Sequence, residues 1–183
     1  YKHADIYGMY FCTFTCYKWL HLFEITSSYD LVYNWFSLLK NKSKGQIIAY
    51  VIMPNHLHFI VYFETPCFNL NSIISNAKRF MAYEIVRRLK QKNEEIILDK
   101  LNESVSERER NKGQLHKVFK DSFDAKAIFS DTFLHQKIAY IHHNPVHRKW
   151  KLVNAYTDYE HSSASYYELN IIKHFMPLHY NAI

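Results

Sequence analysis

The sequence has few cysteines, and their number and spacing argue against a disulfide-stabilised fold. The chain has an odd number of cysteines, namely Cys12, Cys16 and Cys67. The first two lie four residues apart in a segment that we expect to form a strand. A structural zinc site built from them would need a fourth ligand at a convincing spacing, and the sequence offers none. We therefore expect buried free thiols rather than a disulfide framework.

The sequence also lacks any long hydrophobic run. No apolar segment approaches the roughly 18 to 20 residues that cross a bilayer, and residues 1–17 lack the plan of a signal peptide. No internal repeat or low-complexity tract is evident. These features predict a cytoplasmic protein without membrane association. The length of 183 residues predicts one domain, 1–183, that is large enough to bury a core.

Positive charge is what the sequence has in excess, with a formal net charge of +6. Such a charge favours a polyanionic partner such as nucleic acid, although a membrane surface would also attract it. The charge alone does not decide between these partners.

Strand patterns occupy the first third of the chain, on either side of a helical pattern. Residues 9–17 are dense in aromatic and β-branched types, and the apolar segments 46–53 and 56–63 meet at a Pro-Asn turn. Between them, residues 29–41 carry apolar side chains at helical spacing, with Ser28 as the expected N-cap. We expect a strand, a crossover helix and two paired strands.

A long amphipathic helix is predicted from Leu70 to Leu89. One of its faces is apolar, and the other is basic through residues that include Lys78, Arg79 and Arg87. Such a face would suit a phosphate backbone, but a solvated surface is the commoner meaning of the pattern. The three residues are therefore candidate contacts to nucleic acid on a helix that is itself well supported.

The charged segment 91–114 is poor in apolar periodicity, so we expect a mobile loop or insertion there. Two strand patterns follow, at residues 116–123 and 127–129. A further helix is predicted to begin at a Ser130 cap and to end near Asn144, because the residue before a proline disfavours helical geometry.

The C-terminal tail from Val146 onward is first basic and then rich in tyrosine. Arg148 and Lys149 belong to the basic part, which also contains Trp150. Aromatic side chains next to cations stack on unpaired bases, so this tail would suit the binding of single strands. The same aromatic side chains would equally well pack the tail onto the domain.

A pair of histidines opens the second strand of the expected strand pair. In His56-Leu57-His58 both imidazoles lie on the same side of the strand, because side chains alternate with a period of two. That spacing allows two ring nitrogens to bind one metal ion. A lone pair of this kind is more often two polar residues at a strand end, so its assignment depends on a second feature.

That second feature lies on the helix before the Asn-Pro sequence. Tyr140 and Asn144 are four residues apart and share one face of the helix. If the helix packs across the histidine strand, the Asn144 oxygen completes a three-ligand site and Tyr140 stands beside the metal. A divalent ion held in this way keeps open positions and polarises a scissile phosphate. After activation by the metal or by a proton acceptor, the phenol would attack phosphorus and form a phosphotyrosine.

Three neighbours of Tyr140 compete for roles in this site. Lys137 lies one turn earlier on the helix and is a candidate to hold phosphate. His143 lies near the face of Tyr140 and would shuttle a proton or contact phosphate, although packing or capping is the commoner role. The sequence leaves the roles of His142 and His143 open.

Three segments together resemble a known family. They are the strand with His56-Leu57-His58, the segment Tyr140-Ile-His-His-Asn-Pro-Val146, and the segment Asp158-Tyr-Glu-His-Ser-Ser-Ala-Ser-Tyr-Tyr167. In this order they resemble the REP-associated tyrosine transposases, which belong to the single-tyrosine branch of the HUH endonucleases. The resemblance extends from roughly Met9 to Tyr167.

The resemblance implies an α+β fold, a ferredoxin-like α/β sandwich with an antiparallel sheet and helices packed mainly on one face. It also implies that His56, His58 and Asn144 bind Mg²⁺ or Mn²⁺ and that Tyr140 is the nucleophile. The reaction would be metal-dependent cleavage and joining of single-stranded or hairpin DNA, with a 5′-phosphotyrosine intermediate and a 3′-hydroxyl leaving group. A monomer is slightly favoured over a homodimer. The candidate DNA contacts are Lys78, Arg79, Arg87, Lys137, Arg148 and Lys149.

Two departures from the family pattern leave the DNA target open. Phe119 stands where family members often have tryptophan, and His147-Arg-Lys-Trp150 replaces a turn of small residues. The competing interpretation is a non-catalytic module, derived from a transposase, that binds structured single strands. A replication-initiation nuclease of the same superfamily would share the chemistry, but we would expect it to carry a helicase-sized extension.

Overall fold

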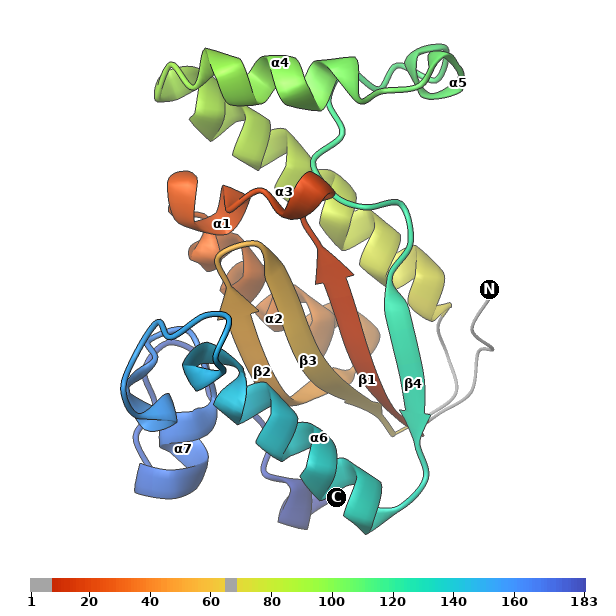
Figure 1. Cartoon of the computed structure of the whole chain (residues 1–183). Helices are drawn as coiled ribbons and strands as arrows, with labels where there is room; N and C mark the ends of the chain where they lie inside the picture. Colours follow the sequence, from red (N-terminus) through yellow and green to blue (C-terminus); the bar gives the residue numbers. More distant parts are fainter. Residues whose placement is uncertain (1–7, 65–68) are drawn as a thin grey trace.

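The computed structural model describes residues 8–64 and 69–183, and its centre is a four-stranded antiparallel sheet (Figure 1). The strands are β1 (Gly8–Thr15), β2 (Gly45–Met53), β3 (His56–Phe63) and β4 (Asp124–Ile128), in the order β2-β3-β1-β4. Strand β3 is central and pairs with both β1 and β2. The predicted α+β class is confirmed, and the strand order is that of a ferredoxin-like βαββαβ fold.

Helices cover both faces of the sheet. Helix α2 (Tyr29–Ser43) and helix α3 (Leu70–Gln91) pack on one face, whereas α6 (Asp131–His143) crosses the other, as Figure 1 shows with α6 in front. The remaining elements are short: α1 (Leu22–Ile25), α4 (Glu95–Glu103), α5 (Glu107–Arg110), α7 (Ala164–Leu169) and the 3-10 turns Tyr17–Trp19, Asn144–Val146, Tyr156–Asp158 and Tyr180–Ala182. The two longest helices, α2 and α3, lie on one face of the sheet as expected. The two histidines of β3 lie on the opposite face, which α6 covers.

The alternation of side chains along the strands builds two hydrophobic layers. On the face of α2 and α3, rings of Phe14, Phe36 and Phe59 pack together and are almost fully buried. On the opposite face, Phe11 and Ile60 belong to a second hydrophobic cluster, which also contains residues of α6. Both faces of the central strands are therefore buried, which explains their continuous apolar runs.

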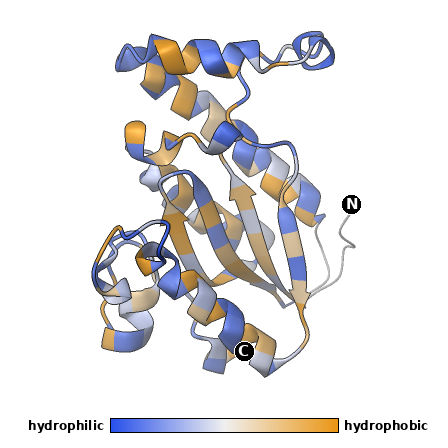
Figure 2. Cartoon of the chain, viewed as in Figure 1, coloured by the Kyte–Doolittle hydropathy of each residue, from blue (hydrophilic) through white to orange (hydrophobic). Residues whose placement is uncertain are grey.

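Residues 91–114 were expected to form a mobile loop or an insertion; the lack of regular structure that a loop implies is wrong, because this segment contains the helices α4 and α5. Leu101 is fully buried in the main hydrophobic cluster, and Val105 is buried as well. Figure 2 shows hydrophobic and hydrophilic segments alternating along α4, whereas α5 is hydrophilic. With nine residues, α4 spans fewer than three turns, so its helical period is too short to stand out in the sequence.

The strand expected at residues 116–123 is also absent from the described structure, and β4 begins only at Asp124. Within the expected segment, Phe119 forms an isolated bridge with Cys16, and the amide of Lys120 donates to the carbonyl of Thr15. The segment runs beside the end of β1 without a continuous ladder. Its buried residues Val118 and Phe119 account for the strand-like pattern, since they pack under the sheet.

Side-chain capping differs between α6 and α2. The Ser130 hydroxyl accepts from the amide of Phe133 and caps α6, as predicted. Ser28 occupies the N-cap position of α2 but makes no capping hydrogen bond, because its oxygen accepts from the Thr26 hydroxyl instead. The α6 helix ends at His143, immediately before the Asn-Pro turn.

The C-terminal tail packs along the outer edge of β2. The amide of Ile52 donates to His161, and the hydroxyls of Tyr159 and Tyr167 donate to the carbonyls of Ile52 and Ile48 at 2.9 and 2.8 Å. These two tyrosines therefore pack the tail onto the domain rather than offering free stacking surfaces. The tail also covers a sheet edge that would otherwise be open to pairing.

The expected free thiols are present where the structure describes them: Cys12 and Cys16 are buried and unpaired by disulfides, and Cys67 lies outside the described residues. Across 8–64 and 69–183, no helix has the length and apolar character that a bilayer crossing would require.

Candidate active site

A cavity of about 320 Å³ lies where the end of α6 meets the start of β3. Its walls come from β1, β3, the first 3-10 turn, α6 and the basic turn that follows α6. The lining residues are Thr13, Thr15, Trp19, His56, His58, Tyr140, His143, Asn144, His147, Lys149 and Trp150. The cavity thus brings together the four residues that the sequence singled out for metal binding and nucleophilic attack.

Strand alternation and helix spacing place these four side chains, as expected. His56 and His58 project from β3 toward α6, and their ring centroids are 4.7 Å apart. Tyr140 and Asn144 come from the last turn of α6 and the turn after it. The Tyr140 hydroxyl lies 3.4 Å from Nε2 of His58 and its side chain is half-exposed, so the phenol is open to a ligand.

His56 is held in one tautomer by its neighbour in the chain. The Asn55 amide nitrogen donates to the carbonyl of Trp19 at 2.8 Å, which leaves its Oδ1 to accept from His56 Nδ1 at 2.7 Å. His56 therefore carries its proton on Nδ1, and the lone pair of Nε2 is available as a metal ligand. Outer hydrogen bonds of this kind orient histidine ligands in metal sites.

His58 has an equivalent support on β1. Thr13 is the register partner of His58, and its hydroxyl lies 2.6 Å from Nδ1 of the imidazole. The ring of Phe11 stacks on the same imidazole at 5.7 Å, from the next position on that face of β1. Both rings of the histidine pair are thus fixed by hydrogen bonds on the side away from Nε2.

The surroundings keep both imidazoles neutral. Burial and, to a smaller extent, the charge of Lys149 together lower the pKa of His56 to about 4, while Asn144 acts in the opposite direction. Burial also lowers the pKa of His58 well below its usual value, with smaller effects from His56 and Lys137. A neutral imidazole is the form that binds a metal ion.

Asn144 provides an independent sign that the cavity suits a cation. Its Oδ1 is buried and has no hydrogen-bond partner within residues 8–64 and 69–183. A buried oxygen without a donor is costly, and a metal ion would satisfy it. The same described residues contain no group of three His, Cys, Asp or Glu side chains able to hold a metal, so an amide oxygen would be the third ligand here. The donor set fits a divalent ion that also takes oxygen ligands from a phosphate.

Of the predicted basic residues, Lys149 lines this cavity and Lys137 lies next to Tyr140 at its edge. The Lys137 ammonium is 4.8 Å from the ring centre of Phe11 and 5.5 Å from that of Tyr140. Lys149 lines the cavity on the side of His56. Arg148, next to it, is exposed and does not line the cavity.

The three residues of α3 that we expected to contact DNA are poorly placed to do so. For Lys78 the prediction is wrong. Its side chain is buried, and the ammonium donates to the carbonyls of Lys120 and Asp121 at 2.5 and 2.9 Å. Lys78 was wrongly assigned to a solvated face because its helical position borders the apolar stripe. Arg79 is exposed and Arg87 pairs with a carboxylate of its own helix, and both belong to the helix on the opposite face of the sheet.

The two histidines after Tyr140 differ in their surroundings. His142 is buried, and its Nε2 lies 2.9 Å from the hydroxyl of Ser163, so it joins α6 to the tail. His143 is exposed at the cavity wall, where Nδ1 donates to the carbonyl of Ala139 and leaves Nε2 free. Only His143 is therefore positioned to contact a bound phosphate.

Several residues of the site were not singled out from the sequence as part of it. Thr13 and Asn55 orient the histidines, while Trp19, His147 and Trp150 complete the walls. The alternation of β1 indicates a common face for Phe11 and Thr13. Only the pairing of β1 with β3, however, brings that face to His58, and no local pattern reveals such a pairing.

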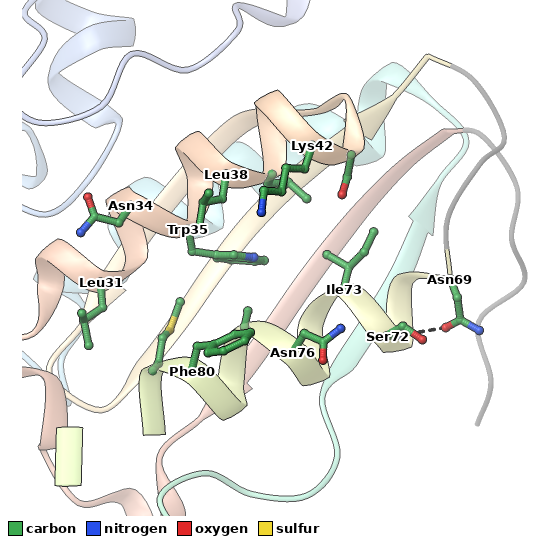
Figure 3. Close-up of a pocket in the computed structure, with 14 residues that line it drawn as sticks. Leu31, Asn34, Trp35, Leu38, Lys42, Asn69, Ser72, Ile73, Asn76 and Phe80 are labelled. Carbon is green, nitrogen blue, oxygen red and sulfur yellow. Dashed lines mark hydrogen bonds between the residues drawn. The ribbon is translucent and has the colours of Figure 1, made fainter. Parts of the chain in front are cut away.

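A second and larger cavity, of about 540 Å³, lies between α2 and α3 on the other side of the sheet (Figure 3). Its lining is mostly apolar, with Trp35, Ile73 and Phe80 pointing into it and Asn34 and Asn76 at its rim. Its lining includes Lys42 but no histidine, cysteine or carboxylate, so it lacks the side chains that most often bind metal ions.

Comparison with known proteins adds a fold relationship. No family model matches the sequence, and no curated protein matches it either. A solved structure of a REP-associated tyrosine transposase bound to a REP hairpin aligns with a TM-score of 0.65, covering 97% of this chain and 91% of that chain. The chain has the fold of a REP-associated tyrosine transposase. Because the two sequences are 17% identical, the alignment establishes the fold and not the chemistry.

A second solved structure, a proposed transposase from Deinococcus radiodurans, aligns with a TM-score of 0.41 at 15% identity, over 77% of this chain and 89% of that chain. This likeness is too low to support an argument about the site.

Proposed function

We propose that this protein is a metal-dependent transposase that cleaves and joins single-stranded DNA, with Tyr140 as the nucleophile. The observation that carries the proposal is the position of the Tyr140 hydroxyl, 3.4 Å from Nε2 of His58 in a cavity that also contains His56 and Asn144. The shared fold supports it, since the protein of known structure binds a REP hairpin. Hairpin DNA is accordingly the first substrate to test.

In the proposed reaction, the Tyr140 oxygen forms a bond to the phosphorus of a DNA phosphodiester, and the bond from phosphorus to the 3′ oxygen breaks. The phenolic proton passes to water or to a basic group in the cavity, and the 3′ oxygen leaves as a hydroxyl after taking up a proton. The 5′-phosphate remains on Tyr140. Attack by another 3′-hydroxyl on this phosphotyrosine reverses the step and joins two strands.

His56, His58 and Asn144 would hold Mg²⁺ or Mn²⁺, which would supply positive charge to polarise the scissile phosphate. Since two imidazoles and an amide are all neutral, the phosphate itself provides the negative charge next to the ion. Lys137, beside the Tyr140 ring, would hold a phosphate oxygen during the attack. This chain therefore orients the phosphate and the phenol together, which is the main requirement of a phosphoryl transfer.

The experiment uses a hairpin oligonucleotide with a single-stranded flank, labelled at either end, and Mn²⁺. We expect a covalent protein–DNA adduct that retains the 3′ label and releases a 5′-labelled fragment with a free 3′-hydroxyl. Tyr140→Phe should abolish the adduct. Tyr83→Phe, which alters an exposed tyrosine on α3, is the matched control and should leave it unchanged. Equal adduct formation by Tyr140→Phe would refute the assignment.

The competing function is non-catalytic binding of structured single strands. The observation in its favour is the absence, within the described residues, of a three-member cluster of His, Cys, Asp or Glu. Saturable binding of hairpin DNA without any adduct, across several metals and substrates, would favour this alternative.

A further inference from the structure

Two tryptophans flank the His56 side of the cavity, opposite Tyr140. The Trp19 ring centre lies 5.8 Å from that of His56, and the Trp150 ring centre lies 5.5 Å from it. The two indoles come from distant parts of the chain, Trp19 from the turn after β1 and Trp150 from the turn after α6. Trp19 is 46% exposed, so much of its indole is accessible to a ligand.

The backbone that presents Trp19 is strained. Lys18 and Trp19 have φ values of 51° and 58°, so two consecutive residues with side chains adopt the left-handed conformation. Large residues rarely adopt it, and such strain persists where the surrounding structure enforces it, often at functional sites. Here the Asn55 amide donates to the Trp19 carbonyl at 2.8 Å. The residue that orients His56 therefore also fixes the position of Trp19.

Lysine ammonium groups surround the indoles. Lys120 and Lys149 lie 4.6 and 4.8 Å from the ring centre of Trp19, and Lys149 is also 5.3 Å from that of Trp150. Within residues 8–64 and 69–183, neither lysine forms an ion pair with a carboxylate. Trp19 is exposed and Trp150 is half-buried. Indoles beside cations without a carboxylate partner combine a stacking surface for a base with positive charge for the adjoining phosphates.

We propose that Trp19 and Trp150 form a binding site for an unpaired DNA base next to the scissile phosphate, with Lys120 and Lys149 contacting the phosphates on either side of it. The placement of this site beside the cleavage position rests on the proposed function. Both indoles line the same cavity as Tyr140, so a base stacked on them belongs to the strand whose phosphate reaches the histidines. The site selects single strands, because a base in a duplex has no free face to offer.

The chemistry of this site differs from that of the other exposed aromatic residues. Phe80 is 63% exposed on α3, and the Arg79 guanidinium lies over its ring at 5.1 Å, but it borders an apolar cavity away from the histidines. Phe80 is therefore the matched control. It is an aromatic ring beside a cation, but we do not expect it to bind a base.

The test measures binding in the Tyr140→Phe background without divalent metal, so that no cleavage is needed. It compares a short oligothymidylate with an abasic strand that has the same number of phosphates. We expect tighter binding of the base-bearing strand by about 5- to 150-fold, the range that stacking supplies per base. Trp19→Leu and Trp150→Leu should each remove most of this preference while keeping the affinity for the abasic strand. Trp19→Phe should retain part of it, and Phe80→Leu all of it.

A fluorescence measurement adds a second readout. Oligothymidylate should quench the emission of Trp19 and Trp150. Trp19→Leu should remove part of the quenching, and Trp19→Leu with Trp150→Leu should remove most of it, because the third tryptophan, Trp35, is buried in the core. Full base preference in either leucine variant would overturn the proposal, as would an equal loss of affinity for both strands. A base preference without any adduct from the parent protein would refute the proposed function alone, and an adduct without base preference would refute this site alone.

Discussion

The Tyr140 hydroxyl and Nε2 of His58 lie 3.4 Å apart although 82 residues separate them in the sequence. The contact arises because α6 packs across the face of the sheet from which His58 projects. It brings the proposed nucleophile and a proposed metal ligand together within one chain.

Replacing both histidines should separate catalysis from DNA binding. We expect His56→Ala with His58→Ala to remove metal-dependent cleavage, because two of the three proposed ligands are lost. Much of the salt-sensitive binding should remain, since that affinity comes mainly from lysine contacts to phosphates. Cleavage and filter-binding assays over a range of salt would measure both. His135→Ala, at an exposed position of the same α6 helix, is the control, and unchanged cleavage by the double variant would reject the metal site.

Asn55 offers a test of how the site is positioned. Asn55→Ala removes the acceptor that fixes the His56 tautomer, and loss of such an outer hydrogen bond weakens metal binding by about 10- to 100-fold. Titration with Mn²⁺, followed by electron paramagnetic resonance, would measure this change. Asn76→Ala removes an exposed asparagine of α3 and should bind Mn²⁺ as the unmodified protein does. Parental affinity in Asn55→Ala would show that the hydrogen bond has no role in metal binding.

The histidine and tyrosine positions were predictable because they depend on local geometry. A period of two puts His56 and His58 on one side of a strand, and a spacing of four puts Tyr140 and Asn144 on one side of a helix. The supporting residues were not predictable in this way. Thr13 reaches His58 only through the register of β1 with β3, which no segment specifies by itself.

In the fold, too, elements with a local sequence pattern were predictable, whereas contacts between distant segments were not. The βαββ pattern and α6 have strong periodicities and caps, so their existence was predictable from the sequence. The helix α4 was missed because it is only nine residues long, and its stability comes from packing against α3 rather than from propensity. The burial of Lys78 was missed because its carbonyl partners lie in the segment after residue 119, distant in sequence.

The docking of α4 leads to a stability prediction. Leu101 is fully buried, so Leu101→Ala should reduce the free energy of unfolding by about 2–5 kcal/mol. Ile96→Ala, at a position on the same helix that is 73% exposed, should change it by less than about 0.5 kcal/mol. Urea unfolding followed by circular dichroism would compare them. Equal effects of the two substitutions would contradict the packing of α4 on the core.

The stability of the domain should depend on pH through His161. Burial lowers the pKa of this imidazole to about 4, and the ring stacks on Tyr29 at 3.6 Å. The unfolded chain binds the proton near pH 6.5 and the folded chain does not, so stability should fall as the pH decreases from about 6.5 to about 4. Above that range His161 should contribute no pH dependence.

Chemical unfolding at several pH values would measure this effect, with His161→Gln as the variant. The slope of stability against pH should be smaller in the variant, although other buried histidines keep it from vanishing. An identical slope in both proteins would contradict the assignment to His161.

The most direct test of the central claim is to locate the covalent bond itself. After incubation with hairpin DNA and Mn²⁺, the protein is digested with nuclease and protease and the peptides are analysed by mass spectrometry. The account predicts that the peptide containing Tyr140 carries a nucleotide through its 5′-phosphate, and that no other tyrosine does. A nucleotide attached to a different residue would contradict it.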